Sequence, residues 1–202
     1  MDPESIWFDY KISGVEEGEN ITVLLQYRFG GANGPTLVLE EPSKVELDRT
    51  LIKGDSSKMT GAFYEIVKPA DEFIGEHQIV FTDVNEKQYK EEFQFQPFLL
   101  ITEIPDTIRR TDLLMELQGL AEDDYVRVLL TDTSFTGVGI HRLDTIKNNR
   151  LVISETDLGK LINGPIHLEL IRENERSVKE KTGEGGRISI TYGLRRTFFL
   201  QD

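Results

Sequence analysis

The chain of 202 residues contains no cysteine. This absence excludes disulfide bonds, thiolate catalysis and cysteine-ligated zinc or iron–sulfur centres. No apolar run approaches the roughly 18 residues that a membrane-spanning helix needs. The three histidines, His77, His141 and His167, lack the spacing of metal ligands, and no serine lies in a GxSxG motif. The sequence therefore predicts no cofactor and no catalytic residue, and an enzyme is the less favoured interpretation.

Positive charge is also scarce, because 23 basic residues face 36 acidic ones and give a formal net charge of −13. Such a field repels phosphate backbones, so we expect neither nucleic acid nor an anionic membrane surface as a partner. With 38% hydrophobic and 29% charged residues, the composition is that of an ordinary globular protein. The length fits one large domain or two smaller ones.

The hydrophobic residues that are present recur with a period of two, which is typical of β-strands with one buried face. Within residues 21–29, for example, every second residue is a large apolar or aromatic one. About seven segments of this kind occur in each half of the chain, separated by turn sequences such as GGANGP at residues 30–35. This pattern indicates an antiparallel β-sandwich or β-barrel.

One phrase occurs in both halves, as DEFIGEHQIVFTD at residues 71–83 and KLINGPIHLELI at residues 160–171. Its two glycines, Gly75 and Gly164, are 89 residues apart, and this offset aligns Phe73 with Ile162. A glycine at the start of a strand permits the positive φ of a sharp corner. Before the second copy, SETD at residues 154–157 has the form of a capping box and predicts a short helical turn near residues 155–162.

This repeated phrase resembles the corner between strands E and F of immunoglobulin-like sandwiches. The chain as a whole resembles bacterial tandem immunoglobulin-like or fibronectin-like proteins of uncharacterised function, although it lacks the Cys…Trp…Cys pattern of antibody domains. The resemblance implies an all-β fold of two tandem antiparallel sandwiches. We assign the first to residues 1–98 and the second to residues 99–202, with a long hairpin at about residues 172–188 in the second.

The single tryptophan, Trp7, is a candidate binding residue. Alternation along residues 5–12 assigns Ile6, Phe8, Tyr10 and Ile12 to the core and leaves Trp7 on the outer face. An indole there offers a wide apolar surface and one hydrogen-bond donor to a protein or glycan partner. The alternative is that a loop covers Trp7, or that a bulge turns it inward.

Acidic residues in the segment LAEDDY at residues 120–125 are candidate metal ligands. Calcium prefers oxygen-rich loops, and tandem immunoglobulin-like modules sometimes bind calcium near their junction. The sequence therefore marks three possible ligands, whose alternative role is that of solvated turn residues: Glu122, Asp123 and Asp124.

These observations predict a non-catalytic binding or adhesion module of a bacterial envelope or secreted protein, with a protein or glycan as its partner. The alternative is a structural spacer in a larger assembly, without a ligand of its own. We expect no membrane insertion within this chain. MDPES at the start is not a signal peptide, so the extracytoplasmic location assumes an export signal that has been removed.

Overall fold

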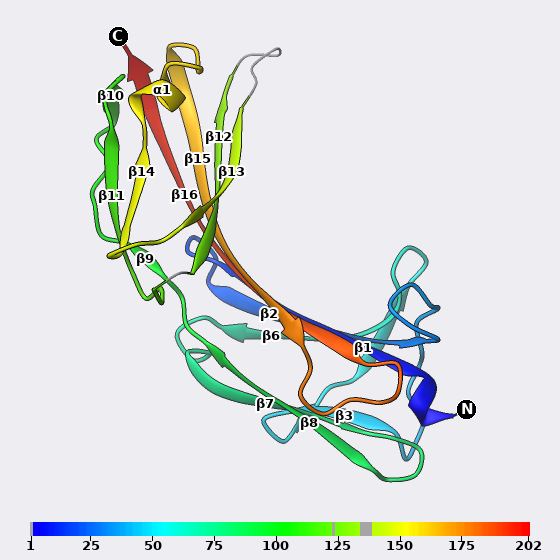
Figure 1. Cartoon of the computed structure of the whole chain (residues 1–202). Coiled ribbons are helices and arrows are strands. Elements are labelled where there is room, and N and C mark those ends of the chain that lie inside the picture. The colour runs from blue at the N-terminus through cyan, green and yellow to red at the C-terminus, as the bar shows by residue number, and fades with distance from the viewer. Residues whose placement is uncertain (1, 123, 134–138) are drawn as a thin grey trace. The chain divides into compact units, whose positions relative to one another are not determined.

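The computed structural model describes residues 2–122, 124–133 and 139–202 (Figure 1). Its regular structure is nearly all β-strand; the helices of this described part are a 3₁₀ turn, η1 (Pro3–Ser5), and a four-residue helix, α1 (Glu155–Leu158). The chain divides into two compact units. Unit 1 consists of Met1–Gly14, Gly18–Gln96 and Asn174–Thr191, and unit 2 consists of Val15–Glu17, Pro97–Glu173 and Tyr192–Asp202.

Unit 1 is a sandwich of two antiparallel sheets. One sheet has the order β1-β2-β6-β5 and the other β4-β3-β7-β8. If the strands are lettered A to G along the chain, with β4 as C′, the two sheets have the orders A-B-E-D and C′-C-F-G. This is the strand order of an immunoglobulin-type sandwich. The strands are β1 (Ile6–Val15), β2 (Asn20–Phe29), β3 (Lys44–Leu47), β4 (Thr50–Leu51), β5 (Gly54–Ser57), β6 (Gly61–Pro69), β7 (Gly75–Thr82) and β8 (Gln88–Phe95).

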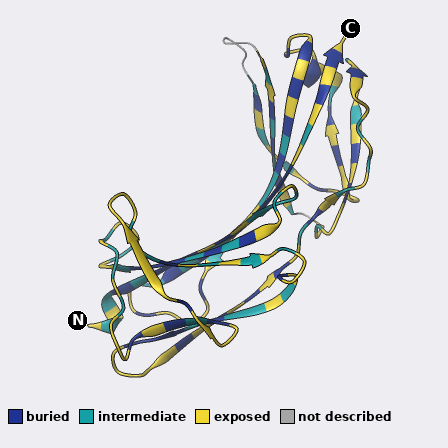
Figure 2. Cartoon of the chain, turned by 180° about the vertical axis from the view of Figure 1, so that it is seen from behind, coloured by how far each residue is buried: buried dark blue, intermediate teal, exposed yellow. Residues whose placement is uncertain are grey.

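Aromatic side chains from both sheets form the core of unit 1. The ring of Phe8 on β1 lies 5.2 Å from that of Phe81 on β7, and the rings of Tyr27 on β2 and Phe81 are stacked 4.5 Å apart. All three side chains are fully buried. Alternation along the strands, visible as bands in Figure 2, sends the intervening residues outward. Burial of such large rings provides most of the stabilisation that a sandwich of this size can gain.

A hairpin from late in the sequence completes unit 1. It is formed by the end of β15 (Gly164–Ser177) and the start of β16 (Gly186–Gln201), and β16 lies next to β1 in the sheet. On the opposite sheet, residues between these strands meet β8: the N–H of Lys179 donates to Glu91 Oε2 (2.5 Å), and Glu180 Oε2 accepts from the N–H of Lys90 (2.7 Å). The hairpin thus contacts an edge of each sheet, and the division at residue 98 stays a prediction.

Unit 2 is a second sandwich with the same plan. One sheet has the order β13-β12-β15-β16, with β10 parallel to β16, and the other has the order β14-β11-β9. These correspond to C′-C-F-G and E-B-A in an immunoglobulin-type domain. The remaining strands are β9 (Leu99–Leu100), β10 (Thr107–Arg109), β11 (Leu113–Gln118), β12 (Tyr125–Asp132), β13 (Ile140–Thr145) and β14 (Arg150–Ile153).

Aliphatic side chains replace the aromatic core in unit 2. Met115 and Leu117 on β11 and Ile153 on β14 are buried on one sheet, and Val128 on β12 and Leu168 on β15 are buried on the other. The strand order and these two cores confirm the expected all-β fold of two immunoglobulin-like sandwiches. No helix in the described ranges is long and apolar enough to cross a membrane.

The repeated phrase marks the same corner in both units. Gly75 begins β7 with φ 130°, and Gly164 begins β15 with φ 139°, so each occupies the left-handed backbone region that favours glycine. The predicted alignment of Phe73 with Ile162 was wrong, however. Phe73 and Leu161 are buried, whereas Ile162 is about half exposed, because the second copy has one more residue between its buried side chain and the glycine.

The predicted cap of the helical turn is confirmed, although α1 ends at Leu158. Ser154 is its N-cap, and the Ser154 Oγ accepts from the N–H of Asp157 (3.2 Å). The Asp157 carboxylate is bound by Ser154, by Lys160 (3.1 Å) and by Arg142. Burial alone would raise the pKa of Asp157, but these hydrogen bonds outweigh it and lower the pKa to about 2. The corner is therefore fixed by a charged network as well as by the cap.

Candidate functional site

Polar side chains line the outer face of β7 and β8 in unit 1. Because Ile79 and Phe81 of β7 are in the core, alternation sends Glu76 and Gln78 to the opposite face. In the antiparallel register, Glu76 is paired with Gln94 and Gln78 with Glu92. Two carboxylates and two amides therefore lie on adjacent strands.

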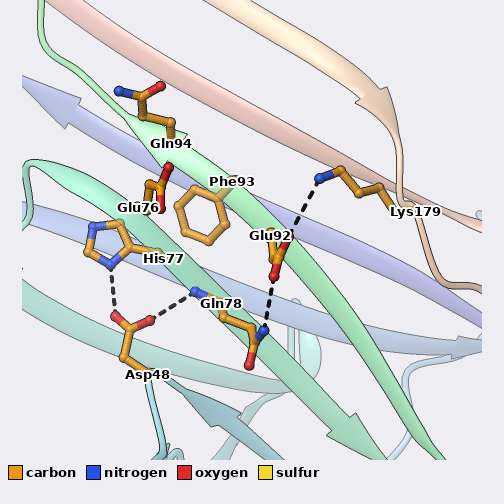
Figure 3. A pocket seen from close by; sticks show the side chains of 8 residues that line it. All are labelled: Asp48, Glu76, His77, Gln78, Glu92, Phe93, Gln94 and Lys179. Atoms are coloured by element: carbon orange, nitrogen blue, oxygen red, sulfur yellow. Dashed lines mark hydrogen bonds and ion pairs between the residues drawn. The ribbon is translucent and has the colours of Figure 1, made fainter.

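These side chains lie in a hollow of about 410 Å³ (Figure 3). Its size is within the range of small-ligand and side-chain pockets. The β3–β4 turn and the hairpin of unit 1 contribute one side chain each at opposite ends of the hollow. The lining consists of Asp48, Glu76, His77, Gln78, Glu92, Phe93, Gln94 and Lys179.

A network around His77 forms one end of the hollow. The His77 Nδ1 lies 2.7 Å from Asp48 Oδ2, and its Nε2 lies 2.9 Å from the carbonyl oxygen of Phe73, both within hydrogen-bond distance. Asp48 Oδ1 also accepts from the N–H of Gln78 (2.8 Å). Asp48 and Arg49 both have positive φ, as the two-residue turn between β3 and β4 requires. These contacts hold the His77 ring between the Asp48 carboxylate and the backbone of Phe73 at this end of the hollow.

At the other end, Gln78 Nε2 donates to Glu92 Oε1 (3.3 Å), and Lys179 Nζ lies 3.9 Å from Glu92 Oε2. Glu76 and Gln94 differ from their neighbours, because their side chains make no hydrogen bond or ion pair with any residue that the structure describes. Both residues line the hollow, from the adjacent strands β7 and β8. A ligand would therefore meet one free carboxylate and one free amide, flanked by groups that are already held in place.

The chemistry of this lining is that of recognition. It offers carboxylate and amide oxygens as acceptors and amide and ammonium groups as donors, but it contains no serine, threonine or cysteine nucleophile. Sequence reasoning missed the hollow because its polar groups come from distant segments. Asp48, His77 and Lys179 are far apart in the chain, and no local motif connects them.

Trp7 lies outside this hollow. Ile6, Phe8, Tyr10 and Ile12 are buried, as the alternation predicts, and Trp7 is on the opposite face and only partly exposed. The hairpin reaches its indole, because a Cβ added at Gly185 would lie 3.4 Å from Trp7 Cζ3. The indole Nε1 is buried and has no hydrogen-bond partner among the described residues. A binding role for Trp7 stays a prediction, and the geometry leaves less of the ring available than the sequence suggested.

The acidic segment before β12 lies in unit 2. Glu122 is exposed, Asp123 lies outside the described residues, and Asp124 Oδ2 accepts from the N–H of Ala121 (2.9 Å). Burial lowers the pKa of Arg172, and the nearby Asp124 carboxylate opposes that shift. Within the described ranges no three His, Asp or Glu residues form a group that could hold a metal ion, and calcium binding stays a prediction.

No protein-family model and no curated protein matches the chain. Among solved structures, the two immunoglobulin domains of DIP-gamma are 11% identical, with 92% of this chain and 94% of that chain covered and a TM-score of 0.26. A tetra-tandem repeat from the extending region of a large adhesion protein is 10% identical, with 96% and 49% covered and a TM-score of 0.30.

A third similar structure is the protein SGBP-B of a mixed-linkage glucan utilisation locus of Bacteroides ovatus, in complex with a mixed-linkage heptasaccharide. It is 11% identical, with 94% of this chain and 60% of that chain covered and a TM-score of 0.23. TM-scores of this size establish neither a shared fold nor a shared function. The immunoglobulin-type description therefore rests on the strand order of each unit.

Proposed function

We propose that this chain is a non-catalytic binding module of a bacterial envelope or secreted protein, and that the hollow on β7 and β8 receives a cationic side chain of a partner protein. The observation that carries the proposal is the free carboxylate of Glu76, which lies in a preformed hollow beside the free amide of Gln94. The extracytoplasmic location follows the resemblance of the sequence to bacterial tandem sandwiches and is part of the same proposal.

The charges in the hollow support a cationic ligand. Asp48 is paired with His77, and Glu92 is shared between Gln78 and Lys179, so Glu76 is the carboxylate left for a ligand. A lysine ammonium or an arginine guanidinium would form a charge-assisted hydrogen bond with it. The net charge of −13 would also attract a basic partner and speed the encounter.

A glycan is the other ligand class that the sequence allows. Protein sites for sugars gain from an aromatic surface on which the ring can lie, and the aromatic residue of this hollow, Phe93, is only 5% exposed. Without an open ring face, the hollow would bind a sugar through hydrogen bonds alone. The lining therefore favours a charged side chain over a sugar ring.

Titration calorimetry with tri-lysine, and with tri-lysine acetylated at its side chains, tests the proposal. We expect the unmodified peptide to bind, the acetylated one to bind much more weakly, and Glu76→Gln to weaken binding about fivefold, as the loss of one exposed ion pair of about 1 kcal/mol implies. Glu19→Gln is the matched control, because Glu19 is an exposed carboxylate of the same unit outside the hollow.

Equal loss of affinity in Glu76→Gln and Glu19→Gln would show that only the overall charge attracts the peptide, and would overturn the assignment to the hollow. Binding of both peptides with equal affinity would do the same. Binding of a neutral oligosaccharide that Glu76→Gln and Gln94→Ala both weaken would replace the cationic side chain by a glycan.

A further inference from the structure

We infer that a second pocket, on the outer face of β1, β2 and β6 in unit 1, binds a small amphipathic organic anion, with an apolar body and a carboxylate or similar group at one end. The pocket has a volume of about 480 Å³, which is large enough for a compact ring system. Its lining consists of Lys11, Leu24, Gln26, Arg28, Met59, Thr60, Phe63 and Glu65. The hollow on β7 and β8 lies on the other sheet, so the two sites are independent.

Hydrogen bonds within the protein preform this pocket. Gln26 is 5% exposed, and its Nε2 donates to the carbonyls of Thr60 (3.0 Å) and Ala62 (3.3 Å), which fixes the turn between β5 and β6 as one wall. Arg28 donates to Gln26 Oε1 (2.7 Å) and to the carbonyl of Gly34 (3.2 Å). These hydrogen bonds hold the wall in place and engage Arg28 through its Nη atoms, whereas the buried Arg28 Nε has no hydrogen-bond partner among the described residues.

The apolar part of the pocket comes from Leu24, Phe63 and Met59. Met59 is 97% exposed, which is unusual for a large apolar side chain in an otherwise folded turn. A methionine has three rotatable bonds and a polarizable sulfur, so it adapts to an apolar or aromatic surface placed against it. We therefore assign Met59 and Phe63 to the contact with the apolar body of the ligand.

The strand register gives the pocket a polarity. Lys11 on β1 is paired with Leu24 on β2, and Leu24 is paired with Glu65 on β6, so an ammonium and a carboxylate lie on either side of the apolar residue. Glu65 forms no ion pair with the residues that the structure describes. Its charge repels an anion, so an anionic ligand is directed with its charged end toward Lys11.

Lys11 is the cation that remains open to this ligand. Its side chain is 47% exposed, and its ion-pair partner, Asp9 Oδ2, is 3.8 Å away. Asp9 is itself 3% exposed and is bound more closely by Arg187, at 2.9 Å from Asp9 Oδ1. Because Arg187 and Arg28 compensate the buried charge of Asp9, Lys11 can turn to a ligand without leaving that carboxylate unpaired.

Fluorescence titration with 8-anilinonaphthalene-1-sulfonate tests the inference, since this probe combines an aromatic body with one anionic group. N-phenyl-1-naphthylamine, which has the same body without the sulfonate, is the matched neutral probe. We expect Lys11→Gln to weaken binding of the sulfonate about tenfold, as the loss of a charge-assisted contact in a partly desolvated site implies, and to leave the neutral probe unchanged. Glu65→Gln should strengthen binding of the sulfonate.

Two further variants separate this pocket from other apolar surfaces. Met59→Asp should weaken both probes, and because Met59 is 97% exposed, the substitution removes no core packing. Lys53→Gln removes an exposed cation of unit 1 that does not line the pocket and should change nothing. Failure of the native protein to bind the sulfonate, or equal effects of Lys11→Gln and Lys53→Gln, would overturn the inference.

Discussion

At the scale of single residues, Asp157 shows how one carboxylate couples stability to pH. Burial would raise its pKa, but hydrogen bonds from Lys160, Ser154 and Arg142 lower it from 3.8 to about 2. Stability from this group is therefore fully present above the unfolded pKa and is lost as the pH falls from about 4 toward 2. We expect Asp157→Asn to cost about 2 kcal/mol of unfolding free energy at pH 7, with a difference from the native protein that shrinks toward pH 3.

Urea denaturation of both proteins between pH 3 and pH 7 measures this difference. The Asp157 side chain is only 11% exposed and Arg142 28%, so solvent screens this pair less than the contact with Lys160, which is 58% exposed. A difference that is the same at every pH would contradict the assigned cause and would point to altered packing at the corner.

Trp7 is a second residue whose role a single variant decides. The hairpin at Gly185 covers part of its indole, and the buried Nε1 has no partner in the described part of the chain. We therefore expect Trp7→Ala to lower the unfolding free energy by about 1–3 kcal/mol and to leave tri-lysine binding unchanged. Trp7→Phe, which keeps most of the apolar area, is the control. Unchanged stability with loss of a protein or glycan ligand would instead support Trp7 as a binding platform.

At the scale of elements, the corner glycines Gly75 and Gly164 have the same role in both units, which is to adopt a positive φ at the start of a strand. A Cβ added at Gly75 or Gly164 would have open space around it, so the cost of alanine is the cost of a positive φ alone. We expect Gly75→Ala and Gly164→Ala each to lower the unfolding free energy by about 1–2 kcal/mol. Thermal unfolding measured by circular dichroism checks this. In the control, Gly193→Ala, φ is not positive and the nearest atom is 3.7 Å away, so a similar loss there would contradict the explanation.

The elements also show what the sequence could and could not predict. Alternation along β2 and the glycines of β7 and β15 were sufficient for the strands and their corners, because burial of one face imposes a period of two. The sequence did not predict that residues 174–191 complete unit 1. Their pattern is polar, and pairing at the edge of a sheet is made by backbone groups, which leave no signal in the side-chain pattern. The hollow was missed because its lining comes from distant segments, with Lys179 reaching it from that hairpin.

At the scale of the whole molecule, unit 1 needs a segment that lies far from it in the sequence. Glu91 on β8 is 2% exposed, and its carboxylate is bound by Arg176 (2.6 Å) and by the N–H of Lys179. A fragment of residues 1–98 lacks both partners and the hairpin that covers this carboxylate, so it loses the ion pair, the hydrogen bond and the packing that the hairpin provides. We expect that fragment to be far less stable than the same fragment joined to residues 174–191 by a flexible linker.

Chemical denaturation and amide hydrogen exchange compare the two fragments. Exchange should be fastest at the edges of β1 and β8 that the hairpin contacts in the full chain. Equal stability of the two fragments would show that residues 1–98 form a complete domain, as the sequence alone predicts.

The late position of this hairpin also has a consequence for biosynthesis. A ribosome delivers strands β1 to β8 of unit 1 before the strands of unit 2, but the segment Asn174–Thr191 that belongs to unit 1 is made only after Pro97–Glu173 of unit 2. Until then, β1 and β8 keep open edges at which a nascent chain can pair with another copy or meet a chaperone. The sandwich of unit 1 can therefore be completed only after most of unit 2 has been synthesised.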